Sequence, residues 1–509
     1  MGDLLAAPGW MSEEVTMREP TPVRNWTGQS EGSGDGGEAS EKGLAQALRR
    51  WDLVPLSVSS VGPLFSVAAT GGVMVGAAGW WTLPAVAVLA LPFLVSSFVF
   101  RVLNRHFPHA GASYHWSARV VGSGAARYQA WILILAYFSS IPPIAIPAAT
   151  YTLALITPHS PPSAAWETVV ALFWICFAAI PLLGGARPTA RLTQLFLAVE
   201  LVALAAITVV GVSRLDALSV PVRFGSPPIG GMLVVAVVAA TVLDGWEIDS
   251  YAAEESRRPR LDPGFGGIVG AFLALGFYAV IYPLMLAETP LSKLAGASDP
   301  MAVWGARLFP GRPWIVLVPV LASTAGGLWL TTYILSRALF AMGREGLLPQ
   351  SFSRLSRRRV PRTAVLAPLA ATAAVVVLQL WFSSLSGFFT LVLSAAGFFL
   401  LAEFFLDSVT ATIFLTVRHR QLPDVQLSPH AHWLLAVGAA ISALVMGALL
   451  VGFFVVGPRV VGGGLDQTLA VLLGAGVAFA WLTRRRGGRT VAFHGRELRS
   501  DPAGGIEEG

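Results

Sequence analysis

The chain has 509 residues, of which 54% are hydrophobic and only 13% are charged. Soluble domains average about 25% charged residues, so this composition excludes an ordinary soluble protein and indicates a chain that lies largely in lipid. The 35 Lys and Arg residues exceed the 29 Asp and Glu residues, but they fall in short segments between apolar runs, which argues against nucleic acid as a partner. With Cys176 as the single cysteine, neither an internal disulfide nor a thiolate metal site can form.

The two ends of the chain differ from the rest in composition. Residues 1–48 are rich in Gly, Ser and Glu and are predicted to be a disordered cytoplasmic tail. They do not contain a charged segment followed by an apolar run, so we expect no cleaved signal peptide. Residues 486–509 are predicted to form a second cytoplasmic tail.

Apolar runs fill most of the chain between these tails. One helical crossing of a bilayer needs about 20 apolar residues. By that criterion the sequence predicts an all-α integral membrane protein with about twelve transmembrane helices. They are expected at 53–78, 82–100, 124–157, 164–183, 192–212, 229–251, 265–287, 314–342, 363–382, 386–417, 432–456 and 466–483.

The distribution of basic residues predicts the orientation of these helices. Cytoplasmic loops of membrane proteins carry an excess of Lys and Arg. If the N-terminus is cytoplasmic, the loops on that side hold most of the loop Lys and Arg residues, and the densest group lies at 354–359. We therefore expect a multi-pass protein of the cytoplasmic (plasma) membrane with both termini inside the cell.

Two of the predicted spans contain signals for a broken helix. In the first span, Pro63 lacks an N–H and Gly62 tolerates the dihedrals of an unwound segment. The sixth span runs into 243–247, Leu-Asp-Gly-Trp-Glu, which places acids at a depth where each costs about 2.5–3.5 kcal/mol. Breaks in the first and sixth spans indicate a five-helix unit repeated with inverted topology and a substrate site between half-helix ends. The alternative is a pair of ordinary Gly/Pro kinks.

Four stretches of the chain resemble permeases of the amino acid–polyamine–organocation (APC) superfamily. They are 60–66, similar to the unwound first helix; 107–116, similar to the loop after the second helix; 244–260, similar to the sixth helix and its exit; and 336–349, similar to the end of the eighth helix. The resemblance implies a LeuT-type 5+5 inverted repeat and alternating-access transport, usually of amino acids or related amines. The transport core would be 50–420, followed by two additional helices at 430–485.

Together the breaks and the resemblance give the candidate substrate-binding residues. These are Gly62, Leu64, Phe65, Ser66, Asp244, Gly245, Trp246 and Glu247. Because Pro63 has no N–H, the amides of residues 64–66 would have to bind a substrate carboxylate. Two readings of Asp244 stay open: it pairs with an extra positive charge on a cationic substrate, or it caps the half-helix that follows it.

Candidates for a coupling ion lie in two other spans. The resemblance places Glu200 where several family members keep a lysine in the space of a lost sodium site, and an acid at that depth could take up and release a proton. Thr331 and Thr332 fall where LeuT-type sodium carriers place a cation site. Pure exchange without an ion is a third possibility. Each residue also has a structural reading, as a helix-stabilising hydrogen bond.

Several further residues are singled out by their depth or charge. Tyr137 and Trp329 are gate candidates, while Glu403 and Asp407 are deep acids to which the sequence assigns no role. At the end of the sixth span, Glu254 and Glu255 are expected to form a salt-bridge latch with Arg257, Arg258 and Arg260. No histidine pair has metal-ligand spacing and no phosphate-binding loop is present, so neither a metal nor a cofactor is expected.

These features predict a secondary active transporter rather than an enzyme, with a small amino acid or amine as substrate and the bilayer as its surroundings. Proton coupling or exchange is the leading mechanism. The alternatives are a sodium-coupled carrier of the same fold and a non-transporting substrate sensor.

Overall fold

The computed structural model describes residues 43–157, 163–382, 385–418, 427–461 and 464–485. The tail predicted at 486–509 and most of the tail predicted at 1–48 lie outside these residues. The last part of the first tail differs from expectation. Leu44 and Leu48 are buried, and the N–H groups of Ala47 and Leu48 donate to the Glu255 carbonyl at 2.9 Å. Residues 43–48 therefore belong to the folded part of the chain.

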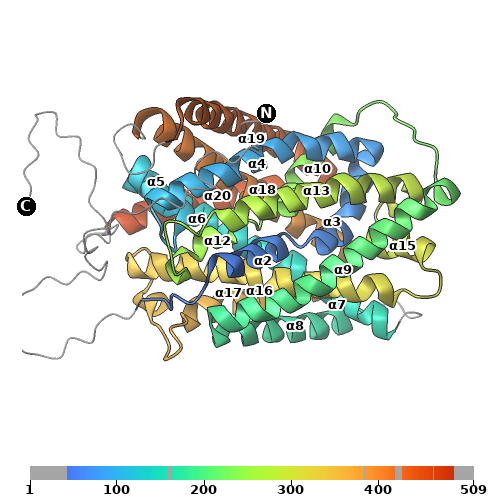
Figure 1. The fold of residues 1–509 in the computed structure, drawn as a ribbon, viewed down its shortest axis with the longest axis horizontal. Coiled ribbons are helices and arrows are strands. Elements are labelled where there is room, and N and C mark those ends of the chain that lie inside the picture. Colours follow the sequence, from blue (N-terminus) through green and yellow to red (C-terminus); the bar gives the residue numbers. More distant parts are fainter. Residues whose placement is uncertain (1–42, 158–162, 383–384, 419–426, 462–463, 486–509) are drawn as a thin grey trace, which may run out of the picture. The chain divides into compact units, whose positions relative to one another are not determined.

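The described residues form helices and contain no β-strand. Figure 1 shows the long helices packed side by side. The helical elements are α2 (Arg50–Val61), α3 (Pro63–Ala78), η1 (Gly79–Trp81), α4 (Thr82–His106), α5 (Ala112–Val120), α6 (Ser123–Ser140), α7 (Pro142–Ile156), α8 (Ala164–Gly184), α9 (Ala186–Leu218), α10 (Ile229–Val238), α11 (Ala240–Leu243), α12 (Ile248–Tyr251), η2 (Ala253–Glu255), α13 (Phe265–Glu288), α14 (Leu291–Leu294), α15 (Pro300–Leu308), α16 (Trp314–Arg344), η3 (Gln350–Ser353), α17 (Arg362–Leu378), η4 (Gln379–Trp381), α18 (Leu385–Ile413), the π-helix η5 (Phe414–Arg418), α19 (Pro429–Val461) and α20 (Leu465–Arg485).

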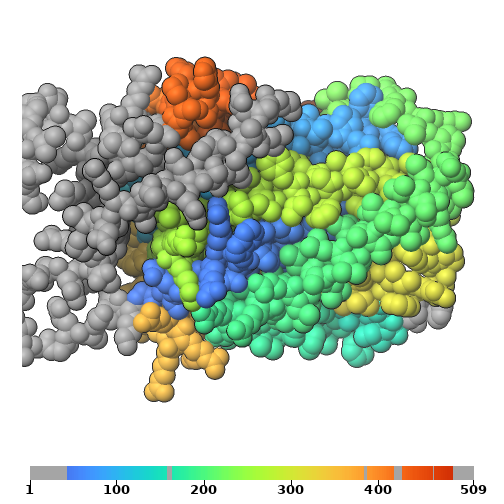
Figure 2. Space-filling model, viewed as in Figure 1, coloured from blue at the N-terminus to red at the C-terminus, as the bar shows by residue number. Residues whose placement is uncertain are grey.

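Ten helical segments of the described chain are long and apolar enough to cross a membrane, which confirms the all-α membrane class. One of them, Arg50–His106, contains α2, α3 and α4, and the shorter apolar helix Ile229–Leu243 lies outside the ten. On the face shown in Figure 2, α9 and α13 lie at the surface. They expose apolar side chains such as Val202, Val209 and Phe272, as helices in contact with lipid do.

The helix break predicted in the first span is present. α2 ends at Val61, Gly62 adopts the left-handed conformation with φ 55°, and Pro63 begins α3. Proline suits a first helical position because the N–H that it lacks would have no partner in the helix. The helix is therefore fully interrupted here, as predicted, and is more than kinked.

A second interruption lies in the sixth apolar segment, also as predicted. α11 ends at Leu243, Asp244 is extended, Gly245 has φ 100°, and the next helix, α12, begins at Ile248. A Cβ atom on Gly245 would lie 2.6 Å from the carbonyl carbon and oxygen of Ser60. Only glycine fits there, so the two breaks touch through their backbones.

The remaining helices surround these breaks. α16 packs against α2, α3, α6, α7 and α9, and α18 packs against α6, α10, α11 and α19. α2 packs against α13 and α9. α16 and α18 therefore supply the side chains that face the broken segments.

Candidate functional site

A small cavity of about 30 Å³ lies between the two breaks. Its lining comes from α2, α3, α6, α7, α11, α16 and α18, together with Asp244. Four of the sequence candidates line it: Phe65, Ser66, Asp244 and Thr331. Ligand pockets usually measure about 300–1,000 Å³, so the surrounding helices must separate before an amino acid fits.

The amides of the first break already have partners. Leu64 donates its N–H to Glu200 Oε1 at 3.0 Å, and Phe65 donates its N–H to Ser323 Oγ at 3.1 Å. Ser323 in turn donates its hydroxyl to Glu200 Oε1 at 2.7 Å. The N–H of Ser66 bonds the Gly62 carbonyl at 2.8 Å. The Leu64 amide was expected to bind a substrate carboxylate. In the structure it donates to the Glu200 carboxylate of α9 instead.

Glu200 is well placed for that interaction. Its side chain is fully buried, and only Oε1 makes hydrogen bonds within the described residues, while Oε2 has none. A negative charge near the first N–H groups of α3 is favoured by the helix dipole. The sequence-based choice of Glu200 as a coupling candidate thus coincides with a direct contact to the first break.

The second break has a different arrangement. Glu247 Oε2 accepts the N–H of Gly245 at 2.8 Å, and Glu247 Oε1 accepts the hydroxyl of Tyr137 at 2.9 Å. Asp244 is half-buried and lines the cavity. Glu247, and not Asp244, therefore accepts the N–H of the break, and α12 has no side-chain hydrogen bond at its N-cap. Asp244 is left facing the cavity.

Nine of the thirteen sequence candidates do not line the cavity, and three of these nine have their contacts elsewhere in the bundle. Trp246 packs against Phe100 and Phe404, with ring centroids 5.1 Å and 5.7 Å away. Trp329 donates its Nε1–H to Thr193 Oγ1 at 3.0 Å, on the α9 side of α16. The Thr332 hydroxyl donates to the Leu328 carbonyl of its own helix at 2.8 Å. Successive residues on a helix point about 100° apart, so Thr331 faces the cavity while its neighbours do not.

Ser323 is a site residue that the sequence analysis missed. It bridges Phe65 and Glu200, yet it is one buried hydroxyl among many in the apolar helices. Nothing in its local sequence distinguishes it from a serine bonded to its own helix. Its place opposite the first break becomes visible only once α16 is packed against α3.

The acids at the end of the sixth segment form ion pairs, but with other partners than expected. Glu255 accepts hydrogen bonds from Nε and Nη2 of Arg337, both at 2.9 Å, and from the hydroxyl of Tyr333. Glu254 accepts hydrogen bonds from both terminal nitrogens of Arg344, at 2.6 Å and 2.8 Å. The latch predicted with Arg257, Arg258 and Arg260 is therefore wrong, and both acids are tied to α16 instead.

The charge state of Glu254 follows from this pairing. Burial opposes ionisation of its carboxyl, but the hydrogen bonds and positive charge of Arg344 outweigh burial and lower the pKa of Glu254. The pair therefore stays ionised at neutral pH and holds the segment after the second break against the end of α16.

Folding also brings together two histidines that are separate in sequence. Ligand atoms of His109, His115 and Glu345 lie within 4.8 Å of one another. His109 Nδ1 accepts the Gly111 N–H at 3.0 Å, and its Nε2 lies 2.7 Å from the Arg344 guanidinium. A cation already faces the cluster, so these residues fit a hydrogen-bond network better than a metal.

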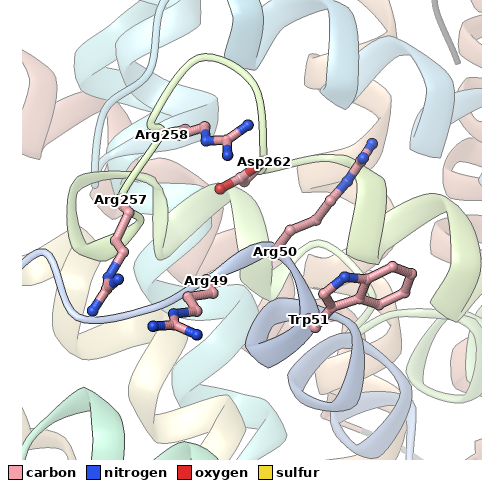
Figure 3. Close-up of a pocket in the computed structure, with 6 residues that line it drawn as sticks. All are labelled: Arg49, Arg50, Trp51, Arg257, Arg258 and Asp262. Atoms are coloured by element: carbon pink, nitrogen blue, oxygen red, sulfur yellow. The ribbon is translucent and has the colours of Figure 1, made fainter. Parts of the chain in front are cut away.

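A larger pocket of about 450 Å³ lies apart from the breaks. Figure 3 shows it lined by side chains from the start of α2 and from the segment after η2, which are Arg49, Arg50, Trp51, Arg257, Arg258 and Asp262. Four guanidinium groups against one carboxylate favour anions. None of the residues predicted to bind substrate lines this pocket.

Two facing helix breaks inside a bundle of apolar helices define a membrane carrier as the class of protein. The chain belongs to the amino acid permease family, whose sequence model matches residues 48–476. This confirms the resemblance to the APC superfamily and makes the protein a transporter rather than an enzyme.

Three relatives of the chain are named as amino acid permeases, exporters or transporters. The branched-chain amino acid permease BcaP of Lactococcus lactis subsp. cremoris (strain MG1363) is 24% identical over 298 residues, 54% of this chain and 64% of BcaP. The L-methionine/branched-chain amino acid exporter YjeH of Escherichia coli (strain K12) is 25% identical over 343 residues, 65% of this chain and 77% of YjeH. Large neutral amino acids transporter small subunit 2 of Homo sapiens is 24% identical over 282 residues, 52% of this chain and 51% of that protein. The chain thus spans between about half and three quarters of the length of these relatives.

Proposed function

We propose that the chain is a secondary active transporter that carries an amino acid or related amine across the cytoplasmic membrane by alternating access. The observation that carries the proposal is the meeting of two broken helices at one cavity, with a carboxylate at each break. The names of the relatives, which specify branched-chain and large neutral amino acids, support an amino acid as substrate.

The proposed architecture is a LeuT-type 5+5 inverted repeat at 50–420 with two further helices at 430–485. Twelve crossings follow if Arg50–His106 counts as two and the broken segment from Ile229 to Tyr251 counts as one. The distribution of Lys and Arg favours cytoplasmic termini.

In the proposed binding mode, the two breaks bind opposite ends of the substrate. Asp244 would bind the ammonium group, because it faces the cavity and its carboxylate is in none of the ion pairs found among the described residues. The amides of Leu64 and Phe65 would bind the carboxylate. Gly62, Gly245 and Glu247 would shape the breaks that present these groups.

Proton coupling follows from competition at the first break. The ionised carboxylate of Glu200 and a substrate carboxylate cannot both occupy the Leu64 N–H, and their charges repel each other. A proton on Glu200 removes the charge and weakens it as an acceptor. Substrate and proton would then bind together. The sodium alternative is less well supported, since Thr331 lines the cavity while Thr332 donates to its own helix.

Ligand binding to purified protein tests this proposal. Thermal stabilisation is measured against the standard amino acids, polyamines and nucleobases, for the wild type and for Asp244→Asn. We expect stabilisation by amino acids that falls in the variant. Hits are then followed as labelled uptake into proteoliposomes. Stabilisation without any uptake would point to the sensor alternative, and uptake that requires sodium would contradict proton coupling.

A further inference from the structure

A row of hydrogen-bonded polar side chains near the second break has no role in the proposed transport mechanism. Glu403 and Asp407 lie one turn apart on α18, and each is 1% exposed. The Tyr251 hydroxyl lies 2.8 Å from Glu403 Oε1, and Ser113 Oγ lies 3.1 Å from the Tyr251 hydroxyl and 2.9 Å from Asp407 Oδ2. Three oxygen–oxygen contacts therefore connect two carboxyl groups.

The number of available hydrogens shows how many protons these three contacts require. A hydroxyl carries one hydrogen, and an ionised carboxylate carries none. If both carboxyls were ionised, Ser113 would donate to Asp407 and Tyr251 would donate to Glu403. The contact between Ser113 and Tyr251 would then join two oxygens with no hydrogen between them. One proton on either carboxyl supplies the missing hydrogen and satisfies all three contacts.

The surroundings of the pair favour that proton. Gln129 donates its Nε2–H to Asp407 Oδ1 at 2.7 Å, which is a neutral contact. None of the ion pairs found among the described residues includes Glu403 or Asp407. Glu247 at the second break interacts electrostatically with both Glu403 and Asp407, and it is itself an acid. Two negative charges on adjacent turns of a buried helix are costly when no cation pairs with them, and one proton removes most of that cost.

We propose that Glu403 and Asp407 form a proton-binding site that holds one shared proton, and that Tyr251 and Ser113 pass it between them. When the proton is on Glu403, Glu403 donates to Tyr251, Tyr251 to Ser113, and Ser113 to Asp407. In a concerted shift each oxygen gives its hydrogen to the next. Three O–H bonds break and three form, one proton moves from Glu403 to Asp407, and no electron is transferred.

The site lies between the second break and α5. The ring of Tyr251 packs against that of Tyr137 at 5.6 Å, and Tyr137 bonds Glu247 of the break. At the other end, Ser113 shares α5 with His115, whose Nδ1 lies 3.1 Å from Glu345 after α16. The pair is therefore connected to Glu247 of the second break through Tyr251 and Tyr137. Only its use in transport rests on the proposed function, because the shared proton itself follows from the contacts.

Infrared spectroscopy of the purified protein at pH 7 tests the shared proton through the C=O stretch of protonated carboxyl groups. The variants are Glu403→Gln, Asp407→Asn and the double variant. Each amide keeps a donor at its end of the chain, so the contacts persist. We expect each single variant to lose the same one carboxylic-acid equivalent, and the double variant to lose no more. Loss of two equivalents in the double variant, or of none, would overturn the proposal.

A further variant keeps the proposal testable if an amide variant does not fold. Tyr251→Phe removes one hydroxyl from the chain but neither carboxyl. We expect it to shift the shared band without removing it, and an unchanged band would overturn the proposal. Because this readout needs no transport, a negative uptake assay would count against the proposed function and leave the shared proton standing.

Discussion

At the first break a carboxylate from another helix accepts an amide hydrogen bond, since Glu200 of α9 accepts the Leu64 N–H. At the second break the carboxylate is local, since Glu247 lies two residues after the Gly245 whose N–H it accepts. A partner on another helix can withdraw when helices move, whereas a local one moves with its own segment. The first break is therefore suited to exchange partners, and the second to hold its shape and leave Asp244 facing the cavity.

The largest expected effect comes from separating the two breaks. Gly245→Ala would place a Cβ atom 2.6 Å from the Ser60 carbonyl, at a φ of 100°. The dihedral alone costs about 1–3 kcal/mol, and the clash with backbone adds to it. We expect a strong fall in the thermal unfolding midpoint of detergent-purified protein. The matched control is Gly276→Ala, where a Cβ meets nothing within 4 Å. Equal midpoints for the two variants would mean that the breaks do not touch.

Removing the Glu200 carboxylate from the first break is expected to have the next largest effect. Glu200→Ala leaves the buried Leu64 N–H without its partner and Ser323 without its acceptor, at a cost of about 1–3 kcal/mol. Glu200→Gln keeps an acceptor oxygen and is expected to restore most of the unfolding free energy. If Gln and Ala destabilise equally, the contact does not depend on hydrogen bonding.

Asp244→Asn separates stability from binding at the second break. Because Gly245 is bonded by Glu247 and not by Asp244, we expect the unfolding free energy to change by no more than about 0.5 kcal/mol. Loss of a charge that pairs with an ammonium group is expected to weaken amino acid binding by roughly tenfold, or about 1.4 kcal/mol. Titration calorimetry with the best ligand measures this. Unchanged affinity together with lower stability would restore the capping role of Asp244.

The smallest expected effect concerns the ion pair after the second break. Because the pKa of Glu254 is lowered in the folded protein, its stabilisation is present above the unfolded value of about 4.3 and is lost as the pH falls through the folded value. Glu254→Gln should lower the unfolding midpoint at pH 7 by an amount equivalent to about 1 kcal/mol, and the difference from wild type should shrink below pH 4. Asp216→Asn, at an exposed carboxylate of α9, is the control. A difference that grows in acid would contradict the pairing with Arg344.

Local signals in the sequence account for the helices and for both breaks. Apolar length predicts the helices, and Gly62-Pro63 and Asp244-Gly245 mark the breaks because glycine and proline act on their own backbone. Contacts between helices could not be predicted in this way. Glu254 and Glu255 stand beside three arginines in sequence, yet pair with arginines 90 and 82 residues away.

The same limit applies to the candidate site. Depth, residue type and the family resemblance selected Glu200 as a coupling candidate, and the structure places its carboxylate at the first break. Trp329 was selected for its depth alone, but the rotation of α16 turns its ring toward Phe196, with ring centroids 5.1 Å apart. Which face of a buried helix points to the cavity is decided by packing. Because α16 is buried on almost all sides, its apolar residues form no single stripe that would show this face in the sequence.

We propose that Glu200 leaves the Leu64 amide of the first break and takes up a proton when substrate binds. The most direct test of this proposal is uptake of a labelled amino acid into proteoliposomes under an imposed pH gradient, for the wild type and for Glu200→Gln. We expect the wild type to accumulate substrate from the acidic side, while Glu200→Gln exchanges substrate across the membrane but does not accumulate it. Equal accumulation by both proteins would contradict the claim.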